Sequence, residues 1–128
     1  MRVVARTVLK SHYSAAMKAI AGSGANGFSG DGGIAVNAAL STPTHIDVND
    51  LNEIVFSDSL NHRIRRISRN GTITTIAGNG KAQFTGDGIN ALQLSLNSPS
   101  SVFLTNDNEI FIADSGNNPH WNMLLHVT

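Results

Sequence analysis

The sequence predicts an all-β protein made of short antiparallel strands. The first observation is the dipeptide Asn70-Gly71 between two segments rich in β-branched residues, 63–68 and 72–77. Both residues tolerate the positive φ angles of a type I′ turn, so the two segments should pair as a hairpin. The second observation is an internal repeat, in which residues 20–61 match residues 76–117. The third is the regular succession of turn signals between short apolar runs.

Composition narrows the class of protein. The chain has 128 residues, about the size of one domain, and combines a formal net charge of zero with 14% charged residues. This balance argues against general affinity for nucleic acid and against disorder driven by charge. The absence of cysteine excludes disulfide scaffolds, thiol catalysis and zinc sites built on cysteine.

The amino-terminal residues lack the continuous apolar centre of a secretory signal, and no apolar run is long enough to span a membrane. The cytoplasm is therefore the default expectation. Residues 1–19 contain basic residues and no acidic ones, which makes mitochondrial targeting an alternative. We favour two worn strands at residues 2–8 and 16–21, because MKAIAG at 17–22 occupies the position that TTIAG has in the later copy.

The two copies of the repeat align without a gap. Each residue of the first copy matches the residue 56 positions later in the chain. Identical motifs then coincide in order: Ile20-Ala21-Gly22 with Ile76-Ala77-Gly78, Gly30-Asp31-Gly32 with Gly86-Asp87-Gly88, Pro43 with Pro99, Asn52-Glu53-Ile54 with Asn108-Glu109-Ile110, and Asp58-Ser59 with Asp114-Ser115. Self-similarity at a fixed period indicates a solenoid, a propeller or an array. Each copy must then bury its faces against its neighbours.

Turn signals divide one period into four short strands. We expect strands at residues 45–48, 53–57, 63–68, 72–77, 101–105 and 109–113. Four short antiparallel strands form one blade of a β-propeller. The segments between blades then link an outer strand to the next inner strand, and a helical turn within the first linker should direct Leu40 inward.

The segment from Asp58 to Gly78 resembles the core of the NHL repeat. In that pattern an aspartate closes one strand, Asn-His-Arg-Ile-Arg follows, and a glycine hairpin leads to a strand ending in Ile-Ala-Gly. The resemblance covers residues 20–117 and implies a β-propeller, which in this family is commonly six-bladed.

The resemblance does not extend to residues 1–19 or to residues 118–128, which we treat as divergent ends. Pro119 stands where the repeat has Arg63, so the tail should supply no counterpart to the strand at 63–68. We therefore expect an incomplete propeller of about two blades, as a fragment of a longer repeat protein. Bare sheet edges should make the isolated chain self-associate or aggregate.

Two features of the repeat suggest structural sites. Asp58 closes one strand and Arg63 opens the next, close enough for a charge-assisted bond. In the NHL family this pairing looks structural and ties adjacent strands of a blade. Each of the motifs Gly30-Asp31-Gly32 and Gly86-Asp87-Gly88 is interpreted as a loop turn, because its single carboxylate is too little for a calcium ion.

Four arginines occupy one predicted strand and its flank: Arg63, Arg65, Arg66 and Arg69. Some NHL propellers bind RNA through a basic face, so the resemblance makes RNA an alternative partner. Strand alternation, however, places Arg66 on the face opposite to the other three. No aromatic residues are interleaved for base stacking.

Other motifs carry no chemistry. Residues 22–27 match the dinucleotide pattern GxGxxG, but no helix or parallel crossover follows. The five histidines show no metal-ligand spacing and no partners for acid–base catalysis. We therefore predict no catalytic residue, no metal and no cofactor.

The function expected from the resemblance is a non-catalytic NHL-repeat module for protein–protein interaction. Its partner would be another protein or further blades of a longer chain. Two alternatives remain. One is RNA binding through residues 63–69, and the other is a remnant of a propeller enzyme of the peptidyl-hydroxyglycine lyase type.

Overall fold

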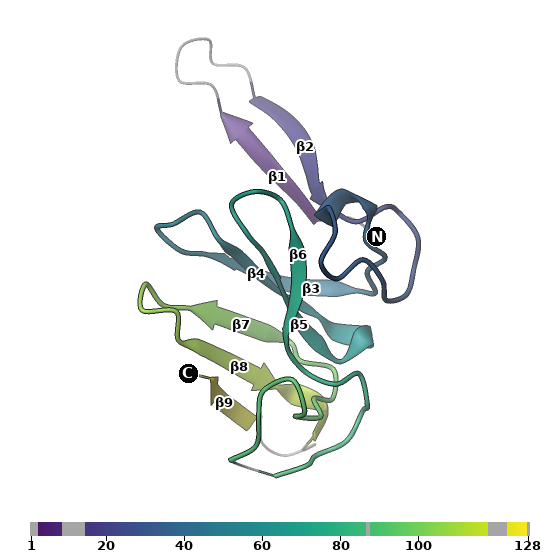
Figure 1. The fold of residues 1–128 in the computed structure, drawn as a ribbon, viewed down its shortest axis with the longest axis vertical. Coiled ribbons are helices and arrows are strands. Elements are labelled where there is room, and N and C mark those ends of the chain that lie inside the picture. Colours follow the sequence, from purple (N-terminus) through teal and green to yellow (C-terminus); the bar gives the residue numbers. More distant parts are fainter. Residues whose placement is uncertain (1–2, 9–14, 87, 118–122, 128) are drawn as a thin grey trace.

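The computed structural model describes residues 3–8, 15–86, 88–117 and 123–127. Within them the chain forms three antiparallel β-sheets that follow one another along the long axis of the molecule (Figure 1). The only helical elements among the described residues are the short 3-10 turns η1, η2 and η3, at Ala35–Asn37, Ser59–Asn61 and Ser115–Asn117. None of the described helices is long and apolar enough to cross a lipid bilayer. The prediction of an all-β fold is confirmed.

The central sheet is a complete four-stranded blade. Its strands are β3 (Pro43–Val48), β4 (Ile54–Asp58), β5 (Arg63–Ile67) and β6 (Ile73–Ala77), hydrogen-bonded in that order. The predicted hairpin joins β5 to β6. Gly71 N donates to the Ser68 carbonyl at 2.8 Å, Ser68 N donates to the Thr72 carbonyl at 2.9 Å, and Gly71 has a positive φ of 86°. Asn70 is not among the residues with positive φ, so the predicted type I′ turn is wrong, and the hairpin closes through a three-residue loop with glycine in the left-handed position.

Each flanking sheet has fewer described strands than the central blade. Strands β1 (Val3–Val8) and β2 (Ala15–Ala21) form a two-stranded sheet, as expected for worn strands at this end. On the other side lie β7 (Ser101–Leu104), β8 (Ile110–Asp114) and β9 (Met123–Val127). The repeat is visible in the backbone as well, because left-handed residues recur at matching positions: Thr42 and Ser98, Asn52 and Asn108.

The expectation for the tail is corrected by β9. Met123 pairs with Asp114 in the same way that Arg63 pairs with Asp58, and the register continues to Val127 opposite Ile110. Strand β9 is thus the counterpart of β5, although the gapless alignment of the two copies does not match them. The sequence comparison missed the strand because the connection before it is four residues longer than the one before β5. Pro119 and its neighbours 118–122 lie outside the described residues.

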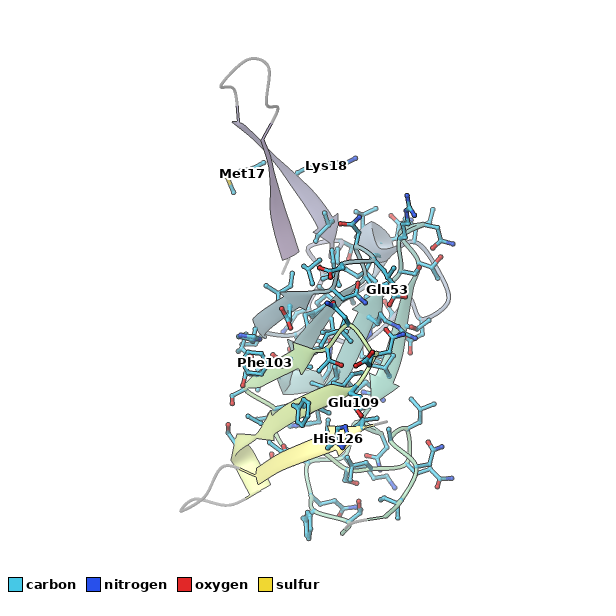
Figure 2. All side chains as sticks on the ribbon, turned by 90° about the vertical axis from the view of Figure 1, so that its left-hand side faces the viewer. Met17, Lys18, Glu53, Phe103, Glu109 and His126 are labelled. Carbon is cyan, nitrogen blue, oxygen red and sulfur yellow. The ribbon has the colours of Figure 1, made fainter. Side chains whose placement is uncertain are left out.

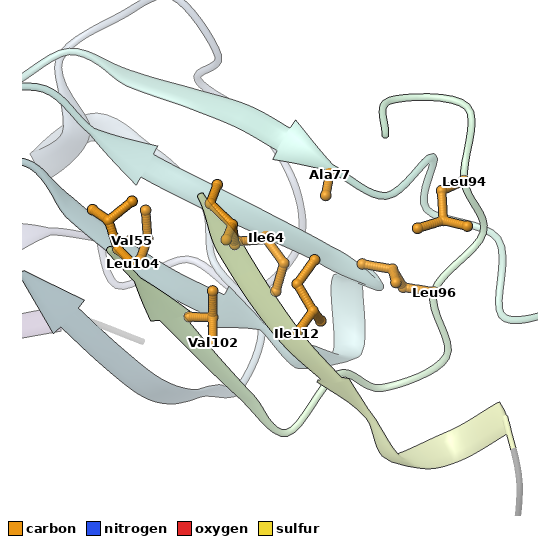
Figure 3. Packing of buried hydrophobic residues seen from close by; sticks show 9 residues of the cluster. Val55, Ile64, Ala77, Leu94, Leu96, Val102, Leu104 and Ile112 are labelled. Atoms are coloured by element: carbon orange, nitrogen blue, oxygen red, sulfur yellow. The ribbon is translucent and has the colours of Figure 1, made fainter. Parts of the chain in front are cut away.

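Apolar side chains fill the two interfaces between the three sheets. The first core lies between β2 and the central blade, and the second core lies between the central blade and β7–β9. The second core, between the central blade and β7–β9, contains Val55 and Ile64 from one side and Val102 and Ile112 from the other (Figure 3). The first core, between β2 and the central blade, contains Phe56, Ile67 and Ile73 together with the linker residues Ala35, Ala38 and Leu40. Leu40 is fully buried, as its predicted inward orientation requires.

Side chains of β3 also tie the inner strands together. The backbone N–H of Leu104 donates to Asp47 Oδ2 at 2.8 Å, and that of Val102 donates to His45 Nδ1 at 3.4 Å. These donors lie on β7, the edge strand of the last sheet. Edge strands are prone to unwanted pairing, and side-chain acceptors from the neighbouring blade satisfy this edge.

Candidate functional site

Arg65 is a fully buried basic side chain in the central blade. Its side chain has no exposed surface, and its guanidinium contacts two carboxylates. Nη1 donates to Asp58 Oδ2 at 3.1 Å, and Nη2 donates to Asp31 Oδ1 at 3.0 Å and to the carbonyl of Ser29 at 3.0 Å. A buried arginine requires such partners, because an unpaired charge in the interior is strongly destabilising.

The two carboxylates come from different parts of the fold. Asp58 closes β4 and is fully buried, where it also accepts hydrogen bonds from Ser41 N and Asn61 Nδ2. Asp31 lies in the glycine-rich turn of the linker that precedes the blade, and its Oδ2 accepts from Thr75 on β6 at 2.7 Å. This cluster, Arg65 with Asp31 and Asp58, therefore joins the linker to three strands of the blade.

Glycine residues let the linker that contains Asp31 pack closely against β6 and against Ala38. Gly32 donates to the Ile73 carbonyl at 2.8 Å, and Ile73 donates to the Gly33 carbonyl at 3.0 Å. A Cβ atom on Gly30, whose φ is 92°, would lie 2.8 Å from Ala38 Cβ. The predicted loop turn at 30–32 is thus also a docking segment, which sequence reasoning missed. The equivalent Asp87 lies outside the described residues.

The expected ion pair between Asp58 and Arg63 is wrong in its partner. Arg63 does lie directly opposite Asp58 in the strand register, but the arginine that binds Asp58 is Arg65, two residues further along the same face. Arg63 donates instead to the carbonyls of Asn61 and Asn79, at 3.0 and 3.2 Å. Its guanidinium lies 3.7 Å from the centre of the Phe28 ring.

Burial lowers the pKa of Arg63, and the neighbouring charge of Arg65 lowers that pKa further. Three interactions oppose this effect locally: the two carboxylates of the Arg65 cluster and the aromatic face of Phe28. Arg63 therefore acts as a connector between the blade and both of its linkers, since Phe28 and Asn79 belong to different linkers.

The four arginines do not form one basic surface. Arg65 is buried, Arg63 is half-buried against Phe28, and Arg66 is half-buried with its Nη1 3.9 Å from Glu53 Oε2. Arg69 alone among the four is exposed, beyond the end of β5. A nucleic-acid site generally needs a continuous basic strip, and this geometry offers no such strip.

The last sheet has a counterpart of the pair formed by Glu53 and Arg66 in the central blade. Glu109, which directly precedes β8, lies beside His126 on β9, with 3.4 Å between Oε1 and Nε2 (Figure 2). By strand register they match Glu53 and Arg66 of the central blade. At the position of Arg65, β9 has Leu125. Leucine cannot pair with a carboxylate, so the Arg65 cluster of the central blade is not repeated at this position of β9.

The described residues contain no cluster of metal-ligating side chains. No group of three or more histidine, aspartate or glutamate side chains within residues 3–8, 15–86, 88–117 and 123–127 is placed to hold a metal ion. Of the histidines in these ranges, His45 accepts a hydrogen bond from Val102 N on β7, and His62 accepts one from Ser98 N in the linker before β7.

Arg63 provides a test of this structural role. We expect Arg63→Ala to lower the free energy of unfolding by about 1–2 kcal/mol, because it removes two hydrogen bonds from a charged donor and one aromatic contact. A double-mutant cycle with Phe28→Ala, measured by urea denaturation, should give a coupling energy of about 0.5–1 kcal/mol. Additive losses would show that the arginine and the ring do not interact.

By sequence, the chain resembles a known protein over most of its length but matches no family model. No family model matches the chain. It is 29% identical over 91 residues to Protein SUPPRESSOR OF QUENCHING 1, chloroplastic, from Arabidopsis thaliana, a match that covers 70% of this chain and 8% of that protein.

Solved structures give a closer likeness in shape than in sequence. An auxiliary nutrient binding protein from Bacteroides thetaiotaomicron has a TM-score of 0.67 at 21% identity, covering 88% of this chain and 30% of its own. A putative phosphatase from the same organism has a TM-score of 0.68 at 15% identity, covering 88% and 28%. The chain spans less than a third of the length of these neighbours. At such identities the likeness shows the fold alone, and that fold is of the β-propeller type.

Proposed function

We propose that the protein is a non-catalytic β-propeller module of the NHL-repeat type that binds protein. The observation that carries the proposal is the exposed apolar side of β3. Ile46 and Val48 are 44% and 50% exposed, and they point to the same side of the strand. Their repeat counterparts, Val102 and Leu104 on β7, are 0% and 7% exposed.

The internal repeat indicates what would cover Ile46 and Val48. Val102 and Leu104 are buried because the inner strands of the central blade pack over them, with Val55 and Ile64 in the same core. Beside β3 the preceding sheet supplies β1 and β2 among the described residues. A protein surface with two apolar inner strands has the chemistry to complete this side, whether it belongs to a partner or to further blades.

The placement of the charged residues supports a binding role over a catalytic one. Arg65, Asp31 and Asp58 are engaged with one another, and Arg63 is engaged with backbone carbonyls. Full burial of an isoleucine or valine contributes roughly 1.5–3 kcal/mol each. Two such side chains on β3 therefore offer a larger binding energy than an exposed ion pair.

The proposal is tested by placing charges on β3. We expect the wild-type chain to associate with itself in a concentration-dependent manner, because this side and the sheet edges are open. The double substitution Ile46→Lys and Val48→Lys should shift sedimentation-velocity profiles towards the monomer and reduce binding of an apolar dye. The control is Leu60→Lys, at a residue that is 57% exposed in η2. If wild type and double variant were both monodisperse monomers, β3 would not be a binding surface.

A further inference from the structure

Two histidines join the central blade to the last sheet, β7–β9. His45 lies on β3, and its Nδ1 accepts a hydrogen bond from Val102 N on β7 at 3.4 Å. His62 lies between η2 and β5, and its Nδ1 accepts from Ser98 N at 3.0 Å. Both side chains are half-buried. Each bond therefore crosses the interface between the two sheets, from a side chain of one repeat to the backbone of the next.

The protonation state of the ring decides whether these bonds can form. Nδ1 accepts a hydrogen bond only in the neutral imidazole, whose single proton then lies on Nε2. Uptake of a second proton turns Nδ1 into a donor, so that two N–H groups face each other at His62 and Ser98. A buried N–H without an acceptor costs free energy comparable with a lost hydrogen bond. Each of the two bonds is thus lost when its histidine becomes charged.

Other polar contacts across the same interface use different chemistry. The hydroxyl of Ser59 donates to the Pro99 carbonyl at 2.6 Å. The carboxylate of Asp47 accepts from Leu104 N at 2.8 Å. Hydroxyl groups and carboxylates do not ordinarily change charge between pH 5 and 8, whereas imidazole does. The histidine bonds are therefore the contacts of this interface that respond to pH in that range.

The charged groups on the strands around His45 are already engaged. Asp47 uses both carboxylate oxygens for backbone N–H groups, at 2.9 and 2.8 Å. On β4, Asp58 is bound to Arg65. Strand β7 has no charged residue, and it contributes the Phe103 ring, whose centroid lies 5.3 Å from that of the imidazole. The acceptor for Val102 N is therefore the imidazole itself.

Two charged residues adjoin His62, one in the chain and one across the interface. Arg63 follows it directly and donates to two backbone carbonyls. Asp114, at the end of β8, accepts from Asn97 N at 2.8 Å, one residue before Ser98. Arginine has no acceptor atom. His62 Nδ1 is therefore the acceptor to which Ser98 N is bound.

We propose that His45 and His62 form a pH-sensitive joint between the central blade and the last sheet. The joint is tight while both imidazoles are neutral, and it loosens when they take up protons. The unfolded chain binds these protons without losing a bond, so it binds more protons than the native chain, and stability should rise with pH across the range of imidazole. Ser101 occupies the repeat position of His45, so the joint belongs to this pair of repeats. The proposal goes beyond the proposed function, since neither bond involves a partner.

The equilibrium test compares urea denaturation at about pH 7.5 and about pH 5.5, at one protein concentration and one ionic strength. In the wild type we expect the equilibrium constant for unfolding to be roughly 5–30-fold larger at the lower pH, as the loss of one or two hydrogen bonds implies. The pair formed by His126 and Glu109 has the opposite sign, because protonation makes it an ion pair. Both of its side chains are exposed, so its contribution should be small.

The matched control carries His45→Asn and His62→Asn together. Asparagine Oδ1 takes the place of imidazole Nδ1 and accepts a hydrogen bond at any pH. Asparagine also tolerates the positive φ of His62, which is 54°. We expect this variant to remain near wild-type stability at the higher pH and to lose most of the dependence on pH.

A local test uses hydrogen exchange of single amides, followed by NMR in the wild-type chain. After correction for intrinsic exchange rates, protection of Ser98 N and Val102 N should fall about fivefold or more at the lower pH. Ser68 N, which donates to the Thr72 carbonyl within the central blade, is the internal reference and should keep its protection. With His62→Asn alone, Ser98 N should stay protected while Val102 N still responds.

The tautomer of each ring gives an independent readout. Long-range nitrogen–proton NMR spectra at the higher pH should place the single ring proton of His45 and of His62 on Nε2. A proton on Nδ1 would overturn the proposal, since Nδ1 could not then accept. The proposal is also wrong if the wild type has the same urea midpoint at both pH values, or if the asparagine variant keeps the wild-type dependence on pH. The exchange and tautomer measurements need no variant that could fail to fold.

Discussion

Replacing Arg65 with leucine, the residue that β9 has at the matching position, is expected to destabilise the protein by about 3–5 kcal/mol. The substitution leaves Asp58 fully buried without its cationic partner and releases Asp31 from the blade. Removing one member of a buried ion pair costs this much because the other charge remains in the interior. Urea denaturation followed by circular dichroism measures the change as a lower midpoint.

A matched control is available on the same strand. Arg66→Leu removes a half-exposed arginine whose nearest carboxylate oxygen, on Glu53, is 3.9 Å away. Exposed pairs contribute about 0–1 kcal/mol, so this variant should remain near wild-type stability. Equal losses from Arg65→Leu and Arg66→Leu would show that burial of the Arg65 cluster does not govern its contribution.

The second large effect is expected at Gly78, which closes the Ile-Ala-Gly motif. Its φ is 93°, and a Cβ atom there would overlap the His62 carbonyl and approach Arg63 Cα to 2.9 Å. Both neighbours are backbone atoms of the adjacent chain segment, so neither can rotate away. We expect Gly78→Ala to cost roughly 3 kcal/mol or more, since backbone strain adds to the displacement of β5.

Gly32→Ala serves as the control for Gly78→Ala. Gly32 has a similar φ, 82°, but a Cβ atom added there meets no atom within 4 Å. Its substitution should cost only the backbone term, about 1–2 kcal/mol. The difference between the two variants, taken from urea midpoints, isolates the steric contribution. If both variants lost the same stability, the close approach of Gly78 to β5 would not be tight.

Local patterns predicted the strands of the central blade well. Asn70-Gly71 located the hairpin because Gly71 adopts the positive φ that closes the loop between β5 and β6, although the turn is not of the expected type I′. The glycine and asparagine turns recur at matching positions of the repeat, so the same argument located β7 and β8. Short-range turn chemistry and a fixed period do not depend on what the strands pack against.

Other features could not be read from spacing. Asp58 was expected to bind Arg63, which lies directly opposite. In the packed blade Arg63 donates to backbone carbonyls, and Arg65 is the arginine that binds Asp58. Asp31 is far from Arg65 in sequence, and the linker must dock on β6 before the two can meet. The strand β9 was missed because a longer connection shifts it out of the gapless alignment of the two copies.

The sequence by itself determined the fold class, the positions of most strands and the repeat, since these depend on turn chemistry and on alternation within a few residues. The tertiary structure alone decided which arginine is buried, how the linkers dock and where apolar surface remains open. These depend on contacts between residues far apart in the chain. The exposed side of β3 became visible once the burial of Ile46 and Val48 could be compared with that of Val102 and Leu104 at the matching positions of the repeat.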